Sequence, residues 1–292
     1  MEVALQLLPA TITGILYALR VHHLAGTARE VPAWRRACFY GGLCLIVVTV
    51  TSMGSLADEL FWAHMVEHLV IGDLGTLLLV LGLTGPVLAP VLRIGFFDRL
   101  RVLAHPLVAF PLWALNLYFW HVPLFHEAAV RNDVVHATQH FCFVAFGFNM
   151  WMALLGPLPK PAWFGNLARL FYIIAVRITG AILGNVFVFG GHVFFTVYAA
   201  GERAHGISPG ADQNAAGAVM MIEGSLLTLV LFGWLFARTA REGEERQELL
   251  DLAAARGVEL SEARAARAVA AGRGAELRRR IESGSSPTGS PT

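Results

Sequence analysis

Charged residues are scarce in this chain of 292 residues: they make up 15% of it, whereas 56% of the residues are hydrophobic. Soluble domains carry roughly 25% charged residues. The charges are also unevenly placed, because 18 of the 43 fall between Arg241 and Glu282. The part of the chain before Arg241 therefore has too few charges to cover a water-exposed surface of its size, which argues against a compact soluble enzyme.

Other scarcities exclude further classes of protein. The three cysteines show no C-x-x-C spacing, so we expect neither a disulfide framework nor a thiolate metal site. A net charge of +1 gives no sign of a nucleic-acid partner. The N-terminal Met-Glu-Val lacks the basic start of a signal peptide, so the first apolar run is expected to be retained. No internal repeat is present. The class of protein that the composition favours is therefore an integral membrane protein.

Long apolar runs, by contrast, are abundant. A helix that crosses a bilayer needs about 20 mostly apolar residues. The sequence predicts an all-α fold, a polytopic membrane helix bundle with about seven transmembrane helices that forms a first domain over residues 1–238. The seven runs lie at about 4–20, 36–56, 62–83, 105–121, 136–156, 167–190 and 213–237.

Basic residues predict the orientation of this bundle. The first, third and fifth connections and the tail together hold 19 of the 22 Lys and Arg residues, while the second, fourth and sixth connections hold only Arg131 and Arg203. Short cytoplasmic loops carry the excess of basic residues. We therefore expect the N-terminus outside and the C-terminus in the cytoplasm.

The tail differs in composition from the rest of the chain. Its Glu, Arg and Ala content and the ELLDLAAA stretch predict a charged cytoplasmic helical tail over 239–282, either solvated or docked on a partner. The final SGSSPTGSPT, residues 283–292, cannot form a core and is predicted to be disordered.

Histidines gather on one side of the predicted membrane. They are costly in hydrocarbon, and polar groups there usually face a bundle interior or a cavity. Eight of the eleven fall near or beyond the outer face: His64, His68, His121, His126, His136, His140, His192 and His205.

Two histidine pairs have the spacing of a metal site. His64 and His68 are four residues apart near the start of the third run, and His136 and His140 repeat this spacing at the start of the fifth. Residues four apart share one helix face. His121 closes the fourth run at the same depth. These five histidines are the predicted metal ligands, although interhelical hydrogen bonding is the alternative role for intramembrane histidines.

Copper is the metal that this side of the chain favours. Imidazole suits copper and zinc, and thioether sulfur selects Cu(I). Four methionines belong to the same outer half: Met53, Met65, Met220 and Met221.

Three charges lie deep in the predicted spans. Arg177, Asp73 and Glu223 fall at similar depths, so we expect Arg177 to pair with one or both carboxylates, because an unpaired charge there is expensive. The group could be a structural lock or part of a proton or ion path. Glu67, next to His68, is a candidate for fixing an imidazole tautomer.

Three segments together resemble one family, the CtaG-type assembly factors of caa3-type cytochrome c oxidase. HMVEHLVIGDLGTLLLVLGLTGPVL is similar to the family's H-M-x-[QE]-H segment. WHVPLFHEAAVRNDVVHATQHFCFVAFGFNMWMALLGP is similar to its W-H-x-P and H-x-x-x-H sequence, and DQNAAGAVMMIEG to the opening of its last span. The resemblance covers about residues 40–238. This chain departs from the pattern at His126, where tyrosine is common, at GDLGTLLLV, which replaces a Pro-rich centre, and at Met221 and Glu223.

The resemblance implies a non-catalytic helper that matures a haem-copper oxidase by handling copper, with oxidase subunits and membrane lipid as partners and the bacterial inner membrane as its location. By motif match it carries over His64, His68, His121, His136 and His140, with Asp212 and Gln213 as weaker companions.

Three other functions remain open from the residues. His68 and His140 could hold a haem between spans, as in a membrane electron carrier. The string from His64 to His68 also fits H-x-x-E-H, in which Glu67 would activate water in a zinc protease. Buried charges such as Arg177 permit a transporter, although no inverted repeat supports one.

Overall fold

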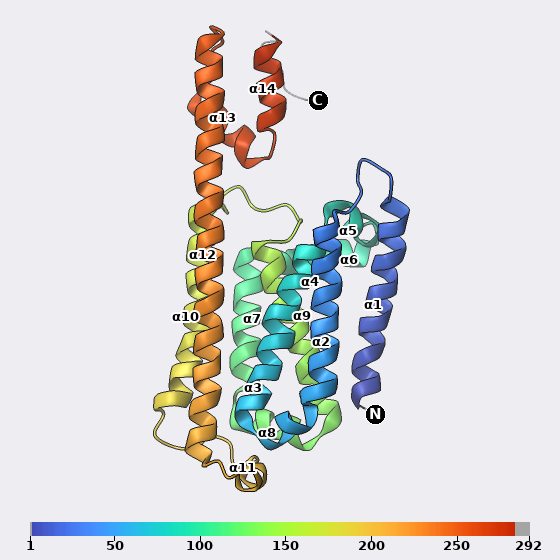
Figure 1. Ribbon diagram of the computed structural model, residues 1–292, viewed down its shortest axis with the longest axis vertical. Coiled ribbons are helices and arrows are strands. Elements are labelled where there is room, and N and C mark those ends of the chain that lie inside the picture. The colour runs from blue at the N-terminus through green and yellow to red at the C-terminus, as the bar shows by residue number, and fades with distance from the viewer. Residues whose placement is uncertain (1, 284–292) are drawn as a thin grey trace. The chain divides into compact units, whose positions relative to one another are not determined.

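The computed structural model describes residues 2–283, and every regular element in that range is a helix (Figure 1). The predicted all-helical class is thereby confirmed. The chain divides into two compact units, Met1–Thr228 and Leu229–Thr292, and the long helix α12 (Pro209–Ala255) contributes to both. The domain limit expected after residue 238 stays a prediction. The disorder predicted for 283–292 falls, except for residue 283, outside the described residues.

Helices occupy all seven of the predicted apolar runs. The elements of the first unit are α1 (Glu2–Leu24), α2 (Ala33–Glu59), α3 (Phe61–Leu69), η1 (Val70–Gly75), α4 (Thr76–Gly82), α5 (Gly85–Leu92), α6 (Gly95–Leu100), η2 (Arg101–Ala104), α7 (Pro106–Trp120), α8 (Pro123–Arg131), α9 (Asp133–Leu154), α10 (Asn166–Phe189), α11 (Ala199–His205) and the start of α12.

Four of the described segments are long and apolar enough to cross a membrane, and a fifth joins them if the bent pair is counted as one span. The four are α2, the continuous stretch from α3 to α4, α10 and α12; the pair is Gly95–Ala104 with Pro106–Trp120, bent by 79°. The remaining two predicted runs are occupied by α1 and α9. In α9 polarity comes from His136, Gln139 and His140, which are all buried.

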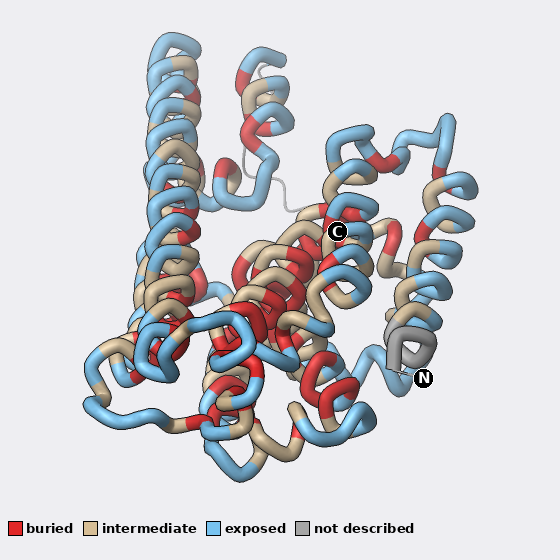
Figure 2. The backbone as a smooth tube through the Cα atoms, turned by 60° about the horizontal axis from the view of Figure 1, so that its bottom comes forward, coloured by how far each residue is buried: buried red, intermediate tan, exposed pale blue. Residues whose placement is uncertain are grey.

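Buried residues concentrate on the central helices of the first unit, as the red segments of Figure 2 show. Helices α2, α4 and α9 each pack against η1, α4 packs against α2 and α9, and α7 packs against α9. The closest approach is at Gly147 of α9, where an added Cβ would lie 1.8 Å from the Gly72 carbonyl oxygen. Only glycine allows two backbones to come this near.

Large apolar side chains cover the outside of this unit. Leu19, Phe141 and Phe189 are 62%, 70% and 76% exposed. A soluble monomer rarely presents an apolar surface of this extent, so these side chains need an apolar neighbour.

A π-helical turn interrupts the middle of the third predicted run. Element η1 lies between α3 and α4, and such turns are common at functional sites. The indole Nε1 of Trp151 donates a 3.0 Å hydrogen bond to the carbonyl of Asp73 within this turn. The Asp73 carboxylate is therefore presented from a widened, anchored turn.

The deep charges pair as the sequence predicts. Arg177 Nη1 lies 3.0 Å from Asp73 Oδ2 and 3.7 Å from Glu223 Oε2. These contacts link α10, η1 and α12 inside the first unit. The expectation that Arg177 pairs with one or both carboxylates is confirmed, and the structure shows that it pairs with both.

The second unit has a small core of its own. It consists of the end of α12, α13 (Glu262–Ala270) and α14 (Gly274–Glu282). An ion pair joins Arg278 to Glu248. The apolar core is formed by Leu249, Ala253, Val269, Leu277 and Ile281.

Candidate metal centre

The first histidine pair is carried by α3, whose start is capped by a residue distant in the sequence. The two carboxylate oxygens of Asp212 accept hydrogen bonds from the backbone N–H groups of Phe61 at 2.8 Å and Trp62 at 2.9 Å. A side-chain acceptor at this position satisfies N–H groups that the helix itself leaves without partners. His64 and His68 thus project from a helix end that is held in place.

The second pair is carried by α9, which has a local cap. The Asn132 side-chain oxygen accepts from the backbone N–H groups of Val134 at 3.0 Å and Val135 at 3.2 Å. His136 and His140 follow within the first two turns. The starts of α3 and α9 lie at the same end of the first unit (Figure 1), so the caps bring two histidine pairs to one place.

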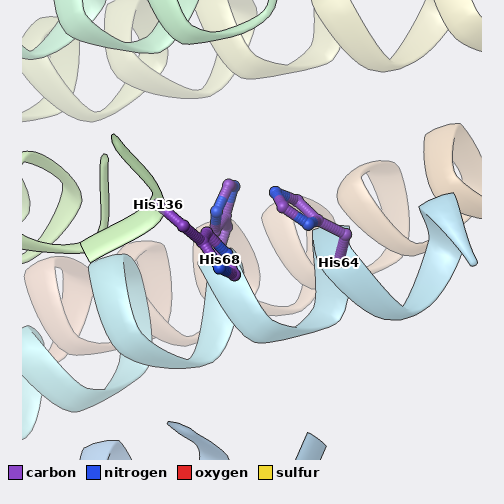
Figure 3. A group of neighbouring side chains, drawn as sticks. All are labelled: His64, His68 and His136. Carbon is purple, nitrogen blue, oxygen red and sulfur yellow. The ribbon is translucent and has the colours of Figure 1, made fainter. Parts of the chain in front are cut away.

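Four of the five predicted ligands meet in two overlapping groups. In the first, the ligand atoms of His64, His68 and His136 lie within 4.8 Å of one another; Figure 3 shows the rings of His64 and His68 projecting from α3 toward that of His136. In the second, the same limit holds for Glu67, His136 and His140. All five side chains are buried. The two groups share His136 and form one compact centre.

The tautomer of His64 follows from its one backbone contact. Its Nδ1 lies 3.3 Å from the carbonyl oxygen of Ala57, which can only accept, so Nδ1 carries the proton. Nε2 is then the bare nitrogen, and it is buried without a hydrogen-bond partner in the part of the chain that the structure describes. A backbone contact of this kind commonly orients a metal-binding imidazole.

His68 is still less satisfied. Both of its ring nitrogens are buried and neither has a hydrogen-bond partner among the described residues. Phe143 packs against the ring with 4.3 Å between centroids. A buried polar group without a partner costs about 1–3 kcal/mol, so His68 is unexplained by packing alone and a bound ion would satisfy it.

Glu67 places a carboxyl group beside the histidines of the centre. Its Oε2 lies 3.6 Å from His140 Nε2, and only 1% of the residue is exposed. A carboxylate among neutral imidazoles favours a cation at this position. The donor set of nitrogen and oxygen atoms therefore fits a divalent or monovalent transition metal.

Comparison with known proteins identifies the family of this chain. A family model described as "Cytochrome c oxidase caa3 assembly factor" matches residues 15–242. The chain belongs to this family. It is also 24% identical, over 255 residues, to a protein of Mycobacterium leprae (strain TN) that is named only as uncharacterized; the match covers 80% of this chain and 38% of that protein. No solved structure matches.

In this member of the caa3 assembly factor family the fifth predicted ligand, His121, stands apart from both groups. It follows α7, and its Nε2 lies 3.3 Å from the sulfur of Met65. The methionine contact brings α3 and the end of α7 together beside the centre. The sequence predicted the depth of His121 but not this partner.

The structure adds a residue that sequence reasoning set aside. His126 of α8 is fully buried, its ring centroid lies 4.7 Å from that of His64, and its Nε2 lies 2.7 Å from the Tyr198 hydroxyl. Burial holds the pKa of His126 well below its usual range. The sequence placed His126 near the outer face together with His192 and His205, and nothing in its position distinguished it from those two histidines.

The remaining outer polar residues have other partners. His205 Nε2 pairs with Glu59 Oε2 at 2.7 Å, on the surface. Gln213 donates to the carbonyls of Phe187 and His192 at 3.1 and 3.0 Å. Asp212 and Gln213, which the resemblance offered as companions of the ligands, therefore bind backbone groups around the centre.

Proposed function

We propose that this caa3 oxidase assembly factor holds copper at the centre formed by His64, His68, His136 and His140, with Glu67 beside them, and passes it to a haem-copper oxidase. The copper is cargo, and the protein acts by binding it. Oxidase subunits are the partners in this proposal.

One observation carries the proposal: a buried imidazole nitrogen is left bare by the tautomer that its backbone contact imposes. Among residues 2–283, His64 Nε2 has no hydrogen-bond partner, and ligand atoms of His68 and His136 lie within 4.8 Å. Imidazole is a ligand that copper accepts readily. A metal ion at this point would coordinate the bare nitrogen of His64 and a ring nitrogen of His68.

Burial favours a carrier over a protease. A catalytic zinc keeps one position open for water and substrate, whereas His64 and Glu67 are 0% and 1% exposed. Glu67 lies against His140 rather than beside an open coordination position. We infer a non-enzymatic role for the H-x-x-E-H segment of this chain.

The proposal places the centre toward the extracytoplasmic side of the bacterial inner membrane. Seven spans, with α1 and α9 among them, put the N-terminus outside and the Arg-rich tail in the cytoplasm, as the distribution of basic residues supports. The exposed apolar side chains such as Phe141 and Phe189 then face lipid.

Anaerobic Cu(I) binding by the purified full chain in detergent tests the proposal. We expect His64→Ala/His136→Ala, which removes one ligand from each helix, to bind about one Cu(I) fewer than wild type. His205→Ala is the matched control, because that histidine is exposed and paired with Glu59. Size-exclusion profiles identify variants that fail to fold.

Two results would count against the copper proposal. One is that the wild type binds no Cu(I) in competition with a chelator from which metallochaperones can take Cu(I). The other is equal binding by wild type and by a folded double variant. Oxidase maturation that depends on the protein but not on these histidines would then leave a scaffold role.

A further inference from the structure

A second cluster of soft ligands lies beside the histidine centre. His121 Nε2 and the thioether sulfur of Met65 are 3.3 Å apart, and the two residues are 8% and 1% exposed. Neither atom belongs to the groups formed by His64, His68, Glu67, His136 and His140. The contact joins the end of α7 to α3.

The chemistry of this contact is unusual. His121 Nδ1 lies 2.7 Å from the carbonyl oxygen of Leu117. A carbonyl only accepts, so Nδ1 carries the ring proton and Nε2 presents a lone pair. A thioether sulfur has no proton to donate. Two lone pairs therefore face each other in a buried place, an arrangement that a cation between them would stabilise.

A small cavity adjoins these two atoms. Its volume is about 50 Å³, and Met65, His68, Asp73, His121 and Met220 are among its lining residues. A space of this size admits an ion or a water molecule. Met220 brings a second thioether side chain to the wall.

We propose that His121, Met65 and Met220 form a second site, selective for Cu(I). This inference rests on the proposed function for the identity of the metal. Thioether sulfur prefers Cu(I) to harder divalent ions, and a mixed imidazole and thioether set differs from the nitrogen and oxygen set of the histidine centre. His68, which lines the cavity and belongs to the centre, lies at the border of the two sites.

The distance between the two ligand atoms agrees with this assignment. Metal bonds of about 2.0 Å to nitrogen and about 2.3 Å to sulfur would span the observed 3.3 Å at an angle of about 100° at the metal. That angle lies close to tetrahedral coordination, so both atoms can reach one ion at the observed separation.

Copper K-edge absorption of the full chain loaded with Cu(I) in detergent tests the second site. We expect a sulfur neighbour at about 2.3 Å in wild type. Met65→Leu conserves volume and should reduce the sulfur signal at least by half and the stoichiometry by about one Cu(I). Met53→Leu, which alters a methionine outside the cavity, is the matched control and should change neither.

The outcomes separate the two proposals. His64→Ala/His136→Ala should keep the sulfur signal while losing the copper that is bound by nitrogen and oxygen alone. If the copper in wild type has only nitrogen and oxygen neighbours, the second site is wrong and the histidine centre is unaffected. This result comes from wild type alone and does not depend on whether a variant folds. A sulfur signal unchanged in folded Met65→Leu or in His121→Gln also overturns it. No Cu(I) binding by wild type overturns both proposals.

Discussion

Single atoms decide which side chains of the centre can bind a metal. His64 and His121 each use Nδ1 to reach a backbone carbonyl, at 3.3 and 2.7 Å, and each thereby turns Nε2 inward. The backbone of α2 and of α7 thus selects the ligand atom before any ion arrives. Preset tautomers reduce the reorganisation that binding requires.

Glu67 should tune affinity for the metal. We expect Glu67→Gln, which keeps the shape and removes the charge, to weaken Cu(I) binding by about 10- to 100-fold, as changes around metal ligands do. Competition with a calibrated Cu(I) chelator measures the effect. Glu59→Gln is the control, since Glu59 is exposed and pairs only with His205. Equal affinities for the two variants would show that Glu67 does not act on the ion.

Arg177 should matter for stability. Arg177→Leu leaves Asp73 and Glu223 without their shared cation, and removing one partner of a buried pair costs about 3–5 kcal/mol. Unfolding in detergent, followed by circular dichroism, measures the loss. Arg101→Leu breaks an exposed pair with Asp98 and should cost about 0.5 kcal/mol or less. A loss below about 1 kcal/mol in Arg177→Leu would mean that the carboxylates are neutral without it.

At the scale of elements, the centre depends on how closely α9 approaches η1. The two backbones meet at Gly147 and Gly72, and Asn132 sets where α9 begins. The π turn adds width to the facing segment, and Trp151 anchors it through the Asp73 carbonyl. The spacing between the two histidine pairs is therefore a property of helix packing.

Gly147→Ala tests this packing. The added methyl group would lie 1.8 Å from the Gly72 oxygen, so α9 has to shift, at a cost of about 1–3 kcal/mol, and the Cu(I) affinity should fall with it. Gly224→Ala in α12 is the matched control: nothing lies within 4 Å of its added Cβ, and helix propensity favours alanine by about 1 kcal/mol. Similar melting temperatures for the two variants would refute the packing argument.

The grouping of the two histidine pairs and the ion pairs of Arg177 could be predicted from the sequence, because each follows from a simple rule. Spacing of four residues and equal depth brought His64, His68, His136 and His140 together, and the expense of an unpaired charge predicted the partners of Arg177. The π turn at Val70–Gly75 has no such sign, since its residues also suit an ordinary helix.

Contacts between distant segments were beyond sequence reasoning. Met65 looked like core filler, and its meeting with His121 depends on where α7 ends. Asp212 was offered as a companion of the ligands, but its distance from the start of α3 follows from the fold alone. Such contacts join residues far apart in the chain, so they cannot be predicted from the sequence around either residue.

For the whole first unit, the burial of histidines should make stability depend on pH. His126 has a lowered pKa when folded, so the unfolded chain binds more protons below about pH 6.5. The free energy of unfolding is then highest above that pH. It falls as the pH decreases, by about 1.4 kcal/mol per pH unit for each such histidine.

The melting temperature in detergent at pH 7.5 and pH 5.5 measures this dependence. We expect wild type to lose more stability on acidification than His126→Gln, which keeps a polar partner for Tyr198 and cannot titrate. His205→Gln serves as the control, because that residue is exposed. A drop of the same size in wild type and His126→Gln would assign the pH dependence to other groups.

The cap on α3 has a consequence for biosynthesis. Asp212 lies 151 residues after the Phe61 amide that it binds, at the start of the last long helix. A nascent chain that has inserted only its earlier spans carries every histidine of the centre but lacks the group that completes the end of α3. The end of α3 is therefore completed only once α12 has been made, and a chain truncated before Asp212 should not form the proposed copper site.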